Sequence, residues 1–151
     1  GNQGMAMKEC TCSQNAIRMY QKKISGPIID RIDLFVDVPP VEIEQLTSAR
    51  SGELSSVVRA RVMHARIRQR ERLGTRGFFT NSEILPQDIE TMCVLTVPAR
   101  QLLETAAQKM DLSARSYSRI LKVARTIADL DESETIDTHH IAESVQYRPA
   151  I

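Results

Sequence analysis

The stretch SARSYSRILKVARTIADL, residues Ser113–Leu130, decides the kind of fold that this chain adopts. Its apolar residues recur at helical spacing, and they are Tyr117, Ile120, Leu121, Ala124, Ile127 and Ala128. This spacing places them on one side of an α-helix, and Ser113 is suited to cap the start of that helix. The stretch therefore predicts a long amphipathic helix with one buried face.

The segment that follows Gly52 also reads as helix. Residues at spacings of three and four predict a first helix there, and they are Leu54, Val58, Val62, Ala65, Gln69 and Leu73. Gly74 is its natural stop, because glycine commonly follows the last turn of a helix. The pattern predicts that this helix carries one apolar face.

Three more helices are expected before the end of the chain. A short one begins near Pro86, and the next begins at Thr96 and Pro98. The buried face of that second helix is expected to carry Leu102, Leu103, Ala106 and Met110. The last helix starts at Asp137, where apolar residues on either side form a hydrophobic staple. Leu54 to Tyr147 are therefore expected to form a compact helical bundle.

The N-terminal part follows a different pattern. Ser13–Ile24 has helical spacing, and a short helix is expected within Ser25–Asp33, where Pro27 suits the first turn. Leu34–Val38 is a nearly continuous apolar run, which is typical of a strand covered on both faces in a parallel sheet. No other segment could supply the rest of that sheet. We therefore expect the end of an α/β core whose beginning lies outside this chain.

These patterns predict three parts and a mainly α fold. Residues 1–40 are expected to be the tail of the core, with one helix and one strand, and residues 1–11 to be disordered or a cloning remnant. Residues 41–52 are polar and weakly periodic, as expected of a linker. Residues 53–148 are expected to form a bundle of four to five helices.

Composition narrows the possible functions. Hydrophobic residues make up 42% of the chain and aromatic residues 4%, with no tryptophan, so an aliphatic helical core is expected. A formal charge of +1 excludes a chain that is basic throughout, as many nucleic-acid binders are. Three cysteines without framework spacing fit a reducing compartment. No apolar run approaches the ~20 residues of a membrane helix, and no secretory signal is present, so a cytoplasmic location is expected.

Arginine is concentrated in one segment. Between Arg59 and Arg76 there are seven arginines and a single acid, Glu71. Arg59, Arg66 and Arg70 share one face of the predicted helix and are candidate contacts for DNA or another phosphate backbone. Two alternatives stay open, since the arginine stems could cover apolar surface or the helix could form a subunit interface.

Four stretches carry a family resemblance: SGPIIDRID (Ser25–Asp33), GELSS (Gly52–Ser56), ARSYSRILKVARTIADL (Ala114–Leu130) and AESVQYR (Ala142–Arg148). In order and spacing they resemble the C-terminal part of the magnesium-chelatase-like AAA+ ATPases, and most of all the ComM-like (YifB-like) branch. The resemblance covers roughly Glu9 to Arg148. It implies the end of an AAA+ core followed by a helical lid.

The resemblance also implies a function for the parent protein. That parent would be a hexameric motor that uses ATP and Mg²⁺ in DNA processing or recombination. The partners of this chain would be its own AAA+ core, the neighbouring subunits and DNA, with no membrane. One alternative is the motor subunit that drives magnesium insertion into a porphyrin. A second, from another class, is a stand-alone helical protein-interaction domain without an ATPase parent.

The resemblance assigns roles to individual arginines, whose guanidinium groups stay charged and fork onto phosphate oxygens. Arg31 is implied to be an arginine finger, acting in trans on the neighbouring subunit's ATP. Arg115 is implied to be the sensor-2 residue, and as a cation in a first helical turn it opposes the helix dipole. Arg119 and Arg125 are candidates for phosphate or subunit contact. The alternatives are a surface salt bridge for Arg31 and a solvated Arg115.

Other motifs point away from catalysis by this chain alone. It has no G-x-x-x-x-G-K-[ST] loop and no strand ending in paired acids, so neither tight ATP binding nor hydrolysis is expected. Cys10 and Cys12 are too few to complete a zinc site, and no metal site is expected. Cys93 is expected in the core. His139 and His140 are expected to face solvent without chemistry.

Overall fold

The computed structural model describes residues 2–3, 9–39, 41 and 52–149. The chain divides into two compact units, Gly1–Ser51 and Gly52–Ile151, and each is described by itself. The expectations for residues 1–11 and for a linker at 41–52 fall mainly on residues 1, 4–8 and 42–51, which lie outside the described residues. No described helix is both long and apolar enough to cross a membrane.

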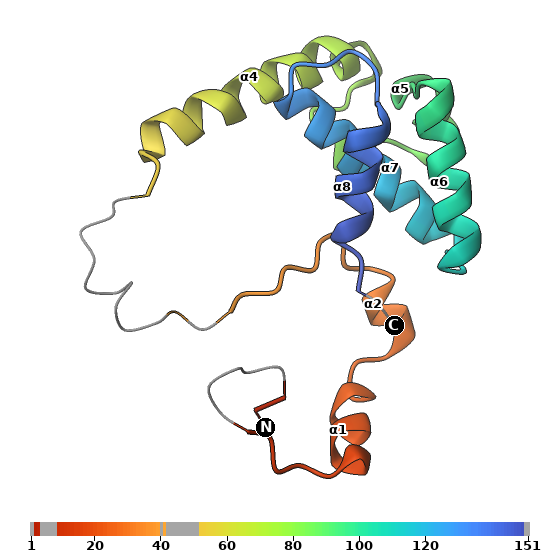
Figure 1. Cartoon of the computed structure of the whole chain (residues 1–151). Helices are drawn as coiled ribbons and strands as arrows, with labels where there is room; N and C mark the ends of the chain where they lie inside the picture. The colour runs from red at the N-terminus through yellow and green to blue at the C-terminus, as the bar shows by residue number, and fades with distance from the viewer. Residues whose placement is uncertain (1, 4–8, 40, 42–51, 150–151) are drawn as a thin grey trace. The chain divides into compact units, whose positions relative to one another are not determined.

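The second unit is a bundle of helices. Its elements are α4 (Ser55–Leu73), η1 (Gly74–Arg76), η2 (Asn81–Glu83), η3 (Pro86–Asp88), α5 (Ile89–Met92), α6 (Val97–Lys109), α7 (Ala114–Leu130) and α8 (Thr138–Gln146). Helix α7 contacts both α4 and α8, and α8 also contacts α6 (Figure 1). The mainly α fold class predicted from the sequence is confirmed, with α7 as its central helix.

Local sequence signals explain where these helices begin. The Ser113 hydroxyl accepts a hydrogen bond from the Ser116 N–H (3.1 Å) and caps α7. The Thr96 hydroxyl caps α6 and donates to the Asp137 carboxylate (3.1 Å), which itself caps α8. Because one hydrogen bond joins the two caps, the first turns of α6 and α8 are held side by side.

The core is aliphatic, as the composition predicts. Its members come from the five α-helices of this unit and from the segments between them, and they are Leu73, Ile84, Ile89, Cys93, Ala99, Leu103, Ile120, Leu121, Ala124, Ala128, Ile136 and Ile141. Cys93 is fully buried, as predicted, and burial raises the pKa of its thiol to about 11. This cysteine therefore stays protonated and serves as packing.

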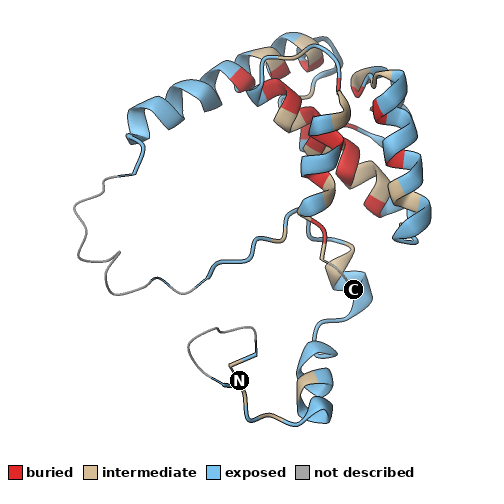
Figure 2. Cartoon of the chain, viewed as in Figure 1, coloured by how far each residue is buried: buried red, intermediate tan, exposed pale blue. Residues whose placement is uncertain are grey.

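Two predicted helix faces differ from the observed ones. In α4, burial begins only at Ala65, because α7 packs against the C-terminal half alone, and Val58 and Val62 are 38% and 44% exposed. Figure 2 shows these first turns of α4 as exposed. In α6, the buried residues are Ala99 and Leu103, so the expected Leu102 and Met110 lie beside the buried stripe and are 37% and 38% exposed. The predicted face of α4 is therefore right but buried over a shorter length, and the buried face of α6 is centred on other residues than predicted.

The first unit contains α1 (Gln14–Gln21) and α2 (Gly26–Ile29), close to the predicted helices. The predicted strand at Leu34–Val38 is wrong for this structure, since these residues run without strand pairing. Leu34, Val36 and Val38 are 50%, 66% and 84% exposed. A strand is completed only by neighbouring backbone, and the described residues provide no such neighbour. The apolar run is therefore left uncovered here.

Candidate nucleotide-binding arginines

Two of the candidate arginines lie together at the start of α7. Arg115 is the second residue of the helix and is exposed, whereas Arg119 follows one turn later and is half-buried. A spacing of four residues places two side chains on the same side of a helix. The structure thus brings Arg115 and Arg119 to one side of the first two turns of α7.

A third arginine, Arg148, is hydrogen-bonded to the first turn of α7. Arg148 lies just beyond α8 and is only 9% exposed, and its Nη2 donates to the Ser116 hydroxyl (2.5 Å). Ser116 is itself hydrogen-bonded by the hydroxyl of the cap Ser113 (3.2 Å). Arg148 was not among the candidates from the sequence. Its only signal was a place in the AESVQYR stretch that carries the family resemblance.

The charges at this helix end are arranged unusually. Arg115 is a cation in the first turn, where the helix dipole is already positive, and Arg148 donates to Ser116 in the same turn. A phosphate group would interact favourably with the exposed backbone N–H groups and with the arginines at once. The arrangement is therefore suited to sense an anionic ligand.

Arg125, the other candidate on α7, has a different role. It is fully buried and donates to the backbone carbonyls of Ser133 (2.5 Å) and Glu134 (2.7 Å). It also lies 3.1 Å from the Asp129 carboxylate. Burial lowers the pKa of Arg125, and Asp129 opposes that effect. The expectation of phosphate or subunit contact is wrong for this residue, which holds the loop after α7 in place.

Asp129 is the centre of a buried polar network that the sequence did not reveal. Arg72, at the end of α4, donates to both carboxylate oxygens of Asp129 (2.7 Å each). The Asn81 amide donates to the same carboxylate (2.8 Å) and accepts from Arg72 (2.8 Å). This network joins α4, the η2 segment and α7, so it fixes α7 relative to the rest of the bundle.

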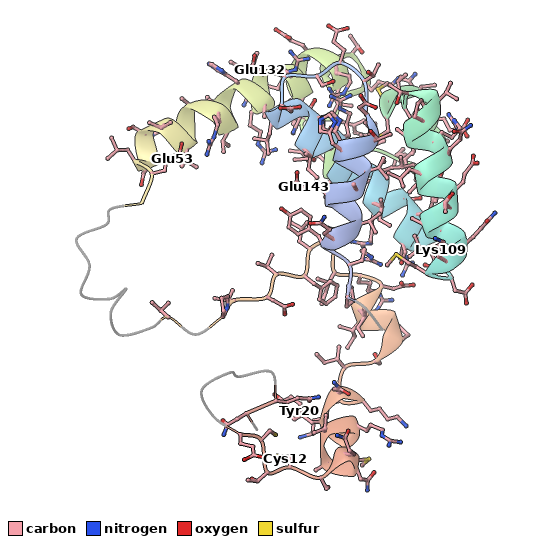
Figure 3. All side chains as sticks on the ribbon, viewed as in Figure 1. Cys12, Tyr20, Glu53, Lys109, Glu132 and Glu143 are labelled. Atoms are coloured by element: carbon pink, nitrogen blue, oxygen red, sulfur yellow. The ribbon has the colours of Figure 1, made fainter. Side chains whose placement is uncertain are left out.

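The arginine-rich segment divides into structural and exposed members. Arg61 pairs with Glu53 (2.8 Å), labelled at the start of α4 in Figure 3, and Arg76 pairs with Asp88. Arg72 belongs to the Asp129 network. The three arginines predicted to share a face, Arg59, Arg66 and Arg70, are exposed as well, and Arg66 donates to the Gln69 side chain (3.2 Å). Their role in DNA binding stays a prediction.

His140 corrects the expectation that both histidines face solvent. His139 is exposed, but His140 is fully buried, and its Nδ1 accepts the Asp137 N–H (2.9 Å) to complete a capping box. The Nε2 atoms of both rings lie 3.2 Å from Asp131 Oδ2. His140 therefore stabilises the start of α8, a role that its neighbours in the sequence do not indicate.

Asp131, His139 and His140 also form a group, among the described residues, whose ligand atoms lie within 4.8 Å of one another. The hydrogen bonds argue against a metal there. Because Nδ1 of His140 accepts a backbone N–H, the proton of the neutral ring sits on Nε2, which then donates to Asp131. A metal-binding histidine has the opposite pattern, with one nitrogen on the metal and the other donating.

Acid should destabilise the helical unit through these carboxylates. Hydrogen bonds from His139 and His140 lower the pKa of Asp131, and the Thr138 N–H lowers that of Asp137. A carboxyl group whose pKa is lowered by folding stabilises the fold above its unfolded pKa, and this stabilisation is lost as the pH falls through the folded pKa. The thermal midpoint, followed by circular dichroism, should therefore drop below about pH 4.

The double variant Asp131→Asn, Asp137→Asn is the control for this pH dependence. It should unfold at a lower temperature than the wild type near neutral pH, and its thermal midpoint should fall less than that of the wild type on acidification. A wild-type midpoint that stays constant down to about pH 3 would contradict the assignment.

Arg31 lies in the first unit. It is exposed and follows α2 directly, where its backbone N–H donates to the Ile28 carbonyl (2.9 Å). This bond closes the last turn and leaves the guanidinium group beyond the helix. Its predicted role as a finger depends on a neighbouring subunit and stays a prediction.

The helical fold of the second unit is consistent with the lid that the resemblance implied. Residues 52–148 match the family model of the magnesium chelatase subunit ChlI C-terminal region, and residues 1–46 match that of magnesium chelatase subunit ChlI. The chain belongs to the magnesium-chelatase-like AAA+ ATPase family.

Curated relatives agree with this family. The competence protein ComM of Haemophilus influenzae is 41% identical over 141 residues, which is 92% of this chain and 27% of that protein. The protein YifB of Escherichia coli is 37% identical over 139 residues, 91% of this chain and 26% of that protein. The chain thus spans about a quarter of the length of these relatives.

Proposed function

We propose that this chain is the arginine-finger and lid portion of an AAA+ ATPase and couples ATP hydrolysis to motion in a hexameric motor. The observation that supports this most is the start of α7, where exposed Arg115, half-buried Arg119 and buried Arg148 gather around one helix N-terminus. Such an end is suited to a nucleotide phosphate held by the rest of the protein.

The two units would act on different nucleotides. Arg115, with Arg119 beside it, would contact the γ-phosphate of its own subunit's ATP. Arg31 would reach the ATP of the adjacent subunit, where a guanidinium group stabilises the charge that develops during phosphoryl transfer. Loss of the γ-phosphate would then release the lid. Because the Asp129 network makes α7 rigid with α4, the whole bundle would move with it.

We infer that the motor acts on DNA. The support is the name of the Haemophilus relative, a competence protein, since competence is the uptake of DNA. The alternative of magnesium insertion into a porphyrin takes its support from the family's own description as magnesium chelatase. ATP turnover that rises with added DNA would favour the first function, and turnover that rises only with a porphyrin would favour the second.

The simplest test compares this chain with the full-length protein. ATP and Mg²⁺ would be held by the part that lies upstream, so the full-length protein should hydrolyse ATP, whereas the 151-residue chain should show no turnover above background. Phosphate release measures both. Turnover by the purified short chain, free of contaminating ATPases, would reject the proposal.

A further inference from the structure

The N-terminal half of α4 and the loop beside it present an apolar surface to solvent. Large apolar side chains there are 38% to 62% exposed, namely Val58, Val62, Met63, Ile67 and Phe79. Four of these follow one another along the helix at spacings of four, one and four residues. They therefore form two short rows, Val58 with Val62 and Met63 with Ile67, and exposed apolar surface of this kind marks an interaction surface.

The surface is hollowed on both sides of Arg66. One hollow of about 220 Å³ is lined by Met63, Arg66, Ile67, Arg70, Phe79 and Thr80. A second of about 320 Å³ lies between α4 and the end of α7, with Val62 and Leu130 among its lining residues. Arg66 and Thr80 line both hollows, so the two form one continuous groove along α4.

The groove is bordered by positive charge. Arg66 and Arg70 line it, and Arg59 lies two turns before Arg66 on the same side of the helix. The single acid of α4, Glu71, lies one turn after Ile67, on the side of the helix away from the arginines. The arginines run along one edge of the apolar patch of Met63, Ile67 and Phe79 and separate that patch from Val58 and Val62.

We propose that this face of α4 binds an amphipathic helix of a partner protein, with an apolar stripe flanked by Asp and Glu. The apolar residues of α4 would pack with the stripe of the partner, in the helix-in-groove mode. Its arginines would pair with the flanking carboxylates and fix the orientation. The proposal concerns a partner of the chain and does not depend on ATP hydrolysis.

The same observations argue against two other occupants. A nucleic acid would leave the apolar side chains of Met63 and Ile67 against a charged backbone. A second copy docked α4 against α4 would bring the arginines of both copies together. Like charges at an interface oppose binding, so charge complementarity favours an acidic partner.

The test uses a fluorescently labelled model peptide and the 151-residue chain. The peptide is a helix of about 18 residues with leucines at i, i+3, i+4 and i+7 and glutamates on both flanks. Anisotropy titration should give a Kd in the micromolar range. A scrambled peptide of equal composition, and one with lysine for glutamate, should each bind at least about tenfold more weakly.

Variants of α4 locate the site. Ile67→Ser should weaken binding of the acidic peptide by about tenfold, and Arg70→Glu by at least as much, while Arg100→Glu on the exposed face of α6 should have no effect. All three residues are exposed, so thermal melts should show each variant folded.

Any of the following results would overturn the proposal. The scrambled peptide could bind as tightly as the acidic peptide, Ile67→Ser could leave binding unchanged, or no binding could be detected at about 100 μM chain. A labelled single-stranded oligonucleotide could also bind more tightly than the peptide, with that binding abolished by Arg70→Glu and unaffected by Ile67→Ser. The last would assign the face to nucleic acid. Self-association in sedimentation that Ile67→Ser removes would assign it instead to a second copy.

Discussion

ATP hydrolysis by the full-length protein should fall about 10³-fold or more when Arg115 is replaced by alanine. Arg115 is exposed at the second position of α7, and its distance from the core means that the loss cannot be attributed to packing. Removal of one guanidinium contact to a phosphoryl group in its transition state has an effect of this size. Steady-state phosphate release measures it.

Arg100→Ala is the matched control for Arg115→Ala. Arg100 is an exposed arginine in the first turn of α6 in the same helical unit, so its loss removes the same charge without touching α7. This variant should hydrolyse ATP at the wild-type rate. Equal rates for Arg115→Ala and the wild type would show that Arg115 is an ordinary surface residue.

The second large effect concerns stability. Asp129→Ala should destabilise the helical unit by about 3–5 kcal/mol, because it leaves the charges of Arg72 and buried Arg125 uncompensated. The network also joins three segments, so its loss frees α4 and the η2 loop from α7. Urea unfolding of the 151-residue chain, followed by circular dichroism, measures the free energy of unfolding.

Two variants serve as comparisons for Asp129→Ala. Glu104→Ala removes an exposed acid from α6 and should change stability by less than about 0.5 kcal/mol. Asp129→Asn keeps the shape of the side chain and part of its hydrogen bonding, so its loss of stability should lie between those of Glu104→Ala and Asp129→Ala. A change of under about 1 kcal/mol for Asp129→Ala would contradict a structural role for the network.

The helices of the second unit could be predicted because their signals are local. The apolar period and the Ser113 cap define α7 within one stretch of sequence, and the same holds for α6 and α8. What a period cannot supply is the extent of the partner surface. Val58 and Val62 continue the stripe of α4, but α7 reaches only its C-terminal half. The strand at Leu34–Val38 failed for a related reason, since a strand depends on backbone that another segment must provide.

Part of the candidate site could be predicted from the sequence because its signals, too, are local. Arg115 could be identified from its position against the helix dipole together with the family resemblance. Arg148 could not, because it meets Ser116 across 32 positions of the chain. The pairing of Arg72 with Asp129 spans 57 positions. No local pattern distinguishes Arg125, which is buried and donates to the carbonyls of Ser133 and Glu134, from Arg115, which is exposed on the same helix.

The central claim is that Arg31 acts across a subunit interface and Arg115 within its own subunit. The most direct measurement is ATP turnover by full-length protein in which each single variant is mixed with a subunit defective in its phosphate-binding loop. Arg31→Ala should regain activity, since an intact loop then meets an intact Arg31 from its neighbour. Arg115→Ala should not, because every intact loop in that mixture belongs to a subunit that lacks Arg115. Recovery in both mixtures, or in neither, would contradict this assignment.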